Sequence, residues 1–191
     1  MSRLIPPVLR STDLPLAVLS AARLDGVLWG IHDGFCPVDE PDRPELRVLA
    51  LSSVVQPHDV IVGRTAAWVH GAGTRVIGPV EVCSRARPLG AWRTGTRYRE
   101  IALDESDLIQ LAPFTPYVTT RARSISDIAV DSLRTIHDSE LVLALSGGDA
   151  ATVRAHAGDL AAARRRPRKA AGLEFLDAVV AEATRRGTSC L

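Results

Sequence analysis

The sequence is poor in cysteine and in aromatic residues. Its three cysteines, Cys36, Cys83 and Cys190, lie far apart and form no CxxC pair. The sequence therefore predicts neither a disulfide framework nor a zinc site, and we expect a cytoplasmic protein. Aromatic residues make up 4% of the 191 residues, so alanine, valine and leucine are expected to fill most of the core.

Long apolar runs and a strong net charge are also missing. No stretch of about 20 apolar residues occurs, so we expect no membrane-spanning helix. The formal net charge of +1 neither favours nor excludes a nucleic-acid partner, and only local clusters of charge bear on that question. Hydrophobic residues nevertheless make up 46% of the chain, which is enough for a sizeable core.

Motifs that carry catalysis are lacking as well. The five histidines form no HxxxH or HExxH pair, and the chain contains no GxSxG or GxGxxG motif. These absences predict a protein that is not an enzyme and that binds no metal and no cofactor. The alternative is an enzyme with an unrecognised site, for which a polar pocket lined by His70 and Glu81 would be the sign.

The first third of the chain reads as a helix, a hairpin and further helices. A helix is predicted over 13–24 with Asp13 as its N-cap, followed by a hairpin whose turn is His32–Gly34. The polar, proline-containing segment 39–44 is the best candidate for a domain boundary. It divides the chain into residues 1–43 and residues 44–191. The predicted hairpin arms are 27–31 and 35–38, and the next predicted helices are 44–55 and 63–70.

The remainder predicts strands followed by helices. Strands in the middle of a chain with helices gathered behind them indicate an α+β fold, here a mixed sheet with a C-terminal cluster of helices. Asp149 follows Gly147 and Gly148 and is expected to cap a helix. The strands are predicted at 79–84, 97–103, 107–111 and 117–120, and the helices at 123–133, 139–147, 149–164 and 169–186.

One run of positive charge stands out near the C-terminus. The sequence "RRRPRK" contains Pro167, which breaks a helix, so its cations are expected around a surface bend. Such a cluster suits contacts with phosphates, but it equally suits a solvated helix junction in which cations favour the helix dipole. Both interpretations stay open. The candidate binding residues are Arg164, Arg165, Arg166, Arg168 and Lys169.

Three segments resemble one known family. The segments "VIVGRTAAWVHG" (60–71), "GPVEVCSRA" (78–86) and "VTTRARSISDIA" (118–129) are similar, in order, to the C-terminal domain of AbiEi-family antitoxins. The segment "RRRPRKAAGLEFLDAV" also resembles the arginine-rich turn and last helix of actinobacterial members. The positions that match the family signature, which we expect to be structural, are Arg64, Trp68, His70, Gly71, Arg123 and Asp127.

The resemblance implies the antitoxin half of a type IV toxin–antitoxin system, whose toxin is a nucleotidyltransferase encoded nearby. Family antitoxins usually carry an N-terminal winged helix that represses their own operon. "GVLWGIHDGFCPVDEP" (26–41) resembles its wing hairpin, but only 25 residues precede it, so a truncated or degenerate winged helix is expected. The leading hypothesis is a non-enzymatic, antitoxin-like protein. The alternative is a DNA-binding transcriptional regulator that uses the winged-helix remnant and the Arg164–Lys169 cluster on operator DNA.

Overall fold

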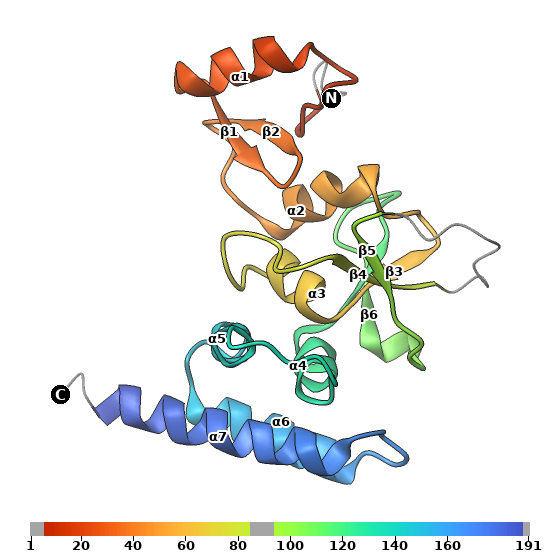
Figure 1. Ribbon diagram of the computed structural model, residues 1–191, viewed down its shortest axis with the longest axis vertical. Coiled ribbons are helices and arrows are strands. Elements are labelled where there is room, and N and C mark those ends of the chain that lie inside the picture. Colours follow the sequence, from red (N-terminus) through yellow and green to blue (C-terminus); the bar gives the residue numbers. More distant parts are fainter. Residues whose placement is uncertain (1–5, 85–93, 189–191) are drawn as a thin grey trace.

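The computed structural model describes residues 6–84 and 94–188; Cys190 and the end of the 78–86 motif lie outside these ranges. The fold is α+β, as the sequence predicts. A hairpin unit lies at one end, a mixed five-stranded sheet in the middle and a layer of long helices at the other end (Figure 1). Within the described ranges, no helix is both long and apolar enough to cross a bilayer.

The N-terminal unit consists of α1 (Leu16–Leu24), β1 (Leu28–Ile31) and β2 (Gly34–Pro37). The predicted hairpin is confirmed: Ile31 pairs with Gly34 around a two-residue turn. The predicted helix start is wrong, because Pro15 is the N-cap residue of α1 and the Asp13 side chain accepts a hydrogen bond from the backbone of Arg10. Proline at this position brings no N–H that the helix would have to satisfy.

The hairpin unit is followed by α2 (Pro44–Ala50) and α3 (Gly63–Val69). The first of these is shorter than predicted, since the chain tightens into a 3-10 turn at Leu51–Ser53. The segment 39–44 is held by contacts from α2, because Arg47 donates two hydrogen bonds to the Asp42 carboxylate.

The sheet has the strand order β5-β4-β3-β7-β6. Strand β3 pairs antiparallel with β4 and parallel with β7, and it lies at the centre of the sheet. The sequence did not predict β3, which is three residues long and fully buried, so it lacks an alternating pattern. The strands are β3 (Asp59–Ile61), β4 (Val80–Ser84), β5 (Thr96–Tyr98), β6 (Leu108–Ile109) and β7 (Tyr117–Thr119).

The strand predicted over 97–103 is wrong in its second half. Pairing with β4 stops after Arg99, whose backbone N–H donates to the carbonyl of Val82. Beyond this point the backbone carbonyls accept hydrogen bonds from side chains instead of a strand: Cys83 donates to Ile101 and Arg123 donates to Ala102. These side chains take the place of the backbone hydrogen bonds that a longer strand would make.

The helical layer contains α4 (Arg121–Ala129), α5 (Asp138–Leu145), α6 (Ala150–Ala162) and α7 (Lys169–Thr188). Asp149 is confirmed as the N-cap residue of α6, where it accepts from two backbone N–H groups. Helix α4 ends at Ala129, earlier than predicted, because the Asp131 carboxylate accepts from the backbone N–H of Leu133 and turns the chain. Figure 1 shows α6 and α7 side by side at the end of the molecule opposite to the hairpin.

Helix α3 joins the two largest apolar clusters. Its Trp68 belongs to the cluster formed with the hairpin, α2 and the sheet, and its Ala67 belongs to the cluster formed by α4, α5, α6 and α7. All seven residues of α3 are buried. The segment "RTAAWV" therefore forms the centre of the molecule, with helices on one side and the sheet on the other.

Candidate functional site

Arg64, at the start of α3, is buried and uses every donor that it has. Its five guanidinium N–H groups donate to the carboxylates of Glu81, Asp131 and Asp138 and to the carbonyl of Leu133, at 2.7–2.9 Å. Its backbone N–H also donates to Glu81, at 2.9 Å. A buried guanidinium is stabilised when all its donors are satisfied in this way.

Two more arginines reach the same carboxylates from β5 and from the residue just after it. Arg97 donates to Glu81 and to both oxygens of Asp131. The Nη1 atom of Arg99 lies 3.6 Å from Glu81 and 3.7 Å from Asp131. Because the two arginines alternate with Tyr98 along an extended segment, they extend to the same side of it.

A second group of ion pairs adjoins this one through α4. Arg123 donates to Asp127 one helical turn later and also to Asp107, and Arg166 pairs with Asp127 at 3.2 Å. Arg99 connects the two groups by donating to the carbonyl of Asp127. We call this set the arginine–carboxylate network. Its ten members are Arg64, Arg97, Arg99, Arg123 and Arg166 with Glu81, Asp107, Asp127, Asp131 and Asp138.

The network fixes the ionisation of two of its members, Asp131 and Arg64. Burial alone would raise the pKa of Asp131, but the hydrogen bonds from Arg97 and Leu133 and the charge of Arg99 outweigh it and lower the pKa well below its usual range. Burial would likewise lower the pKa of Arg64, but the hydrogen bond with Asp138 and the charge of Glu81 raise it. Both groups are therefore charged throughout the physiological range.

The remaining signature positions of α3 make contacts within the fold. Trp68 is buried, with the Arg47 guanidinium 5.1 Å from its ring centre. The Nε2 atom of His70 lies 2.6 Å from the carbonyl of Thr119; because a carbonyl only accepts, Nε2 carries the proton. Burial is the main reason why the pKa of His70 is lowered. Gly71 has φ 95°, so it ends the helix in a conformation that suits glycine.

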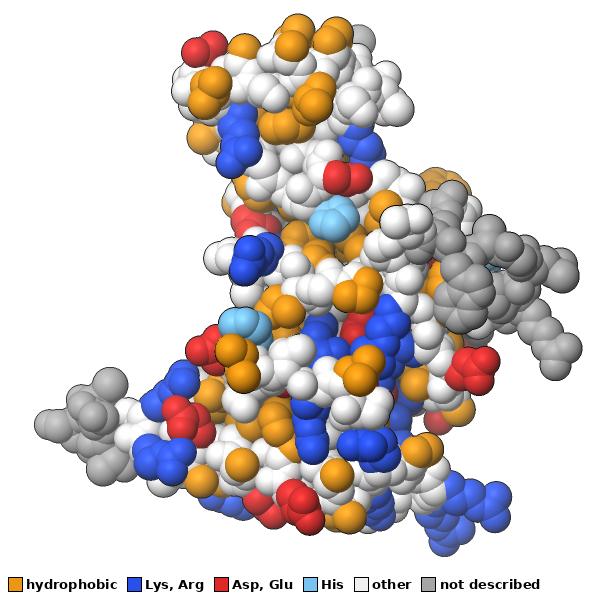
Figure 2. Space-filling model, viewed as in Figure 1, with side chains coloured by type: hydrophobic (Ala, Val, Ile, Leu, Met, Phe, Trp, Pro, Cys, Tyr) orange, Lys and Arg blue, Asp and Glu red, His pale blue; other side chains and the backbone are white. Residues whose placement is uncertain are grey.

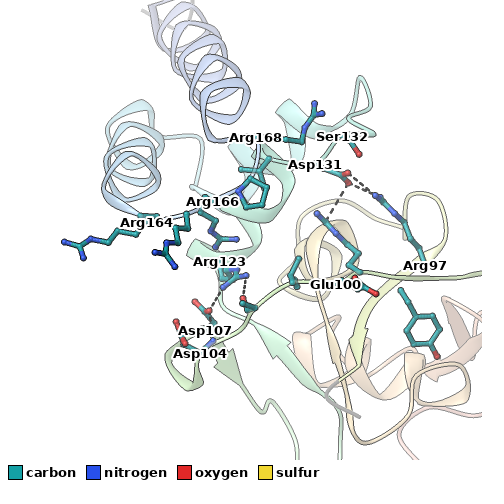
Figure 3. A pocket seen from close by; sticks show the side chains of 18 residues that line it. Arg97, Glu100, Asp104, Asp107, Arg123, Asp131, Ser132, Arg164, Arg166 and Arg168 are labelled. Atoms are coloured by element: carbon teal, nitrogen blue, oxygen red, sulfur yellow. Dashed lines mark hydrogen bonds and ion pairs between the residues drawn. The ribbon is translucent and has the colours of Figure 1, made fainter. Parts of the chain in front are cut away.

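A cavity of about 850 Å³ opens over the network, and we call it the arginine groove. One side is formed by the chain after β5 and the other by the turn between α6 and α7 (Figure 3). Figure 2 shows Lys and Arg side chains gathered on this face between the sheet and the last helices. Seven arginines and four carboxylates are among its lining, which is residues 97–102, Asp104, Asp107, Arg123, residues 130–132 and residues 163–168.

The structure divides the predicted basic cluster into two sets. Arg166 is half-buried and pairs with Asp127. The ammonium of Lys169 donates to the carbonyl of Ala161, in the last turn of α6, and to that of Ala163, which follows the helix. Arg164, Arg165 and Arg168 are exposed. Their side chains have no hydrogen-bond or ion-pair partner within the described ranges. Of the predicted basic cluster, only these three cations are therefore available to an external ligand.

Most charged groups of the groove suit binding better than proton transfer. Its seven arginines stay protonated at any physiological pH, and Asp131, which is held ionised by arginines, is a weak base. Glu81 and His70, which the enzyme hypothesis would place in one polar pocket, bond instead to separate partners: Glu81 to arginines and His70 to a backbone carbonyl. Residues 6–84 and 94–188 also contain no group of three or more His, Cys, Asp or Glu arranged to hold a metal ion.

Sequence reasoning identified Arg64, Arg123 and Asp127 but missed most of their partners. Glu81 had a signal, since it is a single charge inside the apolar strand segment "VEVCS". Arg97 and Arg99 also had one, because "RYR" places two cations on one face of a strand. Asp107, Asp131 and Asp138 lie in turns or at helix ends, where a solvated carboxylate is the usual expectation. Nothing local distinguishes them.

Comparison of the chain with known protein families finds no family whose model matches it, and comparison with curated proteins finds no similar sequence either. The fold and the contacts of the site therefore define the protein as an α+β protein built around a buried arginine–carboxylate network.

Proposed function

We propose that the protein is an antitoxin-like, non-enzymatic protein that neutralises a nucleotidyltransferase-type toxin by a type IV mechanism. One observation carries the proposal: two segments of the AbiEi-like resemblance, 60–71 and 118–129, pack against each other as α3, β7 and α4. His70 bonds to the carbonyl of Thr119, and Arg121 donates to the carbonyl of His70 at 3.1 Å. Segments that resemble one family and also contact each other support a shared fold, since chance resemblances have no reason to lie together.

The chemistry of the buried network agrees with a role in binding. Each of its carboxylates has an arginine partner, so the charged residues of the resemblance are used to hold α3 and α4 in place. A protein that acts by binding needs such a rigid frame rather than a reactive side chain.

The test is co-expression with the product of the neighbouring gene. We expect that product alone to arrest growth, and this protein to restore it when both are expressed. The matched variants are Arg64→Gln, which disrupts the network, and Arg43→Gln, which removes an exposed ion pair with Glu40. Rescue should be lost or weakened only with Arg64→Gln. A neighbouring product that is neither toxic nor bound by this protein would contradict the proposal.

A second candidate, a DNA-binding regulator, is favoured by the three exposed arginines of the α6–α7 turn. The N-terminal unit gives this DNA-binding candidate little support. The only arginine of α1, Arg23, lies against Gly30 of the hairpin, about 3.6 Å from where a Cβ atom would stand. This candidate predicts salt-dependent binding to the protein's own promoter that weakens when Arg164, Arg165 and Arg168 become alanine. Undetectable or salt-insensitive binding would exclude it.

A further inference from the structure

The arginine–carboxylate network is balanced in charge without the exposed arginines of the α6–α7 turn. It contains five arginines and five carboxylates, and each member has a partner of opposite charge. Arg164, Arg165 and Arg168 line the same groove but belong to none of these pairs. Two carboxylates of the lining, Glu100 and Asp104, also lie outside the network, so the three arginines leave the groove with a surplus of positive charge.

The backbone of the turn gives an independent sign that these side chains have a role outside the fold. Arg165 has φ 54° and Arg168 has φ 56°, in the left-handed region that favours glycine. A residue with a Cβ atom is strained there, so glycine at either position would relieve the backbone. The sequence nevertheless places arginine at both positions, one on each side of Arg166–Pro167.

We propose that the arginine groove binds the phosphate groups of a ligand the size of a nucleotide, held by Arg164, Arg165 and Arg168. A guanidinium presents a planar fork of N–H groups, and several forks can share the oxygens of one phosphate chain. The N-terminus of α7, a helix of 20 residues, begins directly after Arg168 and adds to the positive potential at the turn.

The shape of the groove fits such a ligand. Its volume of about 850 Å³ lies within the range of roughly 300–1,000 Å³ that is usual for small-molecule sites. Tyr98, Ile101 and Val130 line it beside the charged residues and offer apolar surface to a base or a sugar. Figure 3 shows Arg164 and Arg166 at one end of the view, Arg97 with Asp131 at the other and Arg168 between them, with the Arg164 side chain directed outward. The inference does not depend on the antitoxin proposal.

The test measures binding of pyrophosphate and of ATP by titration calorimetry. The double variant R165G/R168G removes two cations and also relieves two strained residues. We expect binding to weaken at least about tenfold, because charge-assisted hydrogen bonds are lost. The melting temperature should stay the same or rise, because the backbone strain is relieved. The matched control R75Q/R154Q removes two exposed arginines elsewhere and should bind as the unaltered protein does.

Several outcomes would overturn the inference. It fails if neither pyrophosphate nor ATP binds at millimolar concentration, or if R75Q/R154Q weakens binding as much as R165G/R168G does. A lower melting temperature of R165G/R168G would assign the arginines to the fold. Binding of polyglutamate as tight as that of ATP would point to an acidic peptide. Binding of duplex DNA without binding of ATP would support the operator-binding candidate in its place.

Discussion

At the scale of single residues, Arg64 is the member of the network whose replacement removes the most hydrogen bonds. It is 4% exposed and binds Glu81, Asp131 and Asp138, of which only Asp138 has no second arginine within the described ranges. Replacing one member of a buried ionic group leaves its partners buried without compensation. Replacing Arg64 therefore measures how much it contributes to the free energy of unfolding.

We expect Arg64→Gln to lower the free energy of unfolding by about 3–5 kcal/mol, because the neutral amide leaves carboxylate charge uncompensated in the interior. Urea denaturation followed by circular dichroism measures the change. The control is Arg43→Gln, whose ion pair with Glu40 is 46% exposed on the arginine side, and which should cost less than about 1 kcal/mol. Equal, small effects of both variants would show that the network contributes no more than surface pairs do.

Residue-level prediction from the sequence succeeded where a motif existed. Arg123 and Asp127 are two positions of the family resemblance and stand four residues apart, a spacing that lets them pair on one face of a helix, and they do so on α4. The partners of Arg64 come from β4, from the turn after α4 and from α5. Since those contacts join residues up to 74 positions apart, no local pattern could reveal them.

At the scale of elements, the junction between β3 and α3 depends on one glycine. Gly63 has φ 56°, and a Cβ atom built there would overlap Oε2 of Glu81. The glycine therefore lets the helix start directly against the carboxylate that its next residue, Arg64, binds. Space and backbone conformation both exclude a side chain at this position.

We expect Gly63→Ala to destabilise the protein by at least about 2 kcal/mol, since it combines an unfavourable backbone conformation with a steric overlap. Gly147→Ala is the matched control, because Gly147 has φ 65° but open space around its Cβ position. Gly147→Ala should lower the free energy of unfolding by only about 1 kcal/mol, because only the backbone conformation is unfavourable. Urea denaturation of the two variants gives the comparison, and equal losses would mean that the overlap relaxes without cost.

Most elements were predictable, and the errors have identifiable causes. The hairpin, α3, α6 and α7 carry turn residues, caps or long periodic stretches that act locally. Two errors occur where a side chain takes over a backbone hydrogen bond, as Arg123 does at the distant carbonyl of Ala102 and Asp131 does just after the end of α4. Strand β3 was missed because burial on both faces removes the alternation that marks a strand.

At the scale of the whole molecule, stability is expected to depend on pH through two buried groups. The pKa of His70 is lowered by burial from 6.5, so the unfolded chain binds a proton that the folded chain does not. Stability from His70 is therefore full above about pH 6.5 and falls as the pH drops below that value. The pKa of Asp131 is lowered from 3.8, so its contribution is full above that value and falls at lower pH.

We expect the free energy of unfolding to decrease from pH 7 to pH 5, and His70→Gln to flatten that decrease. Urea denaturation across this range measures it. The control is His137→Gln, which removes an exposed imidazole in place of the buried one. A slope that His70→Gln does not alter would assign the pH dependence to other groups.

The sequence by itself determined the α+β class, the hairpin, the order of the helices and the position of the arginine-rich turn, because glycines, prolines, caps and periodicity act within a few residues. Only the tertiary structure decided which charges meet. It buried Arg64 among three carboxylates and engaged Arg166 and Lys169 with neighbours. It also left Arg164, Arg165 and Arg168 exposed at the rim of a groove. The physical reason is that a charge finds its partner through space, and the folding of distant segments sets that distance.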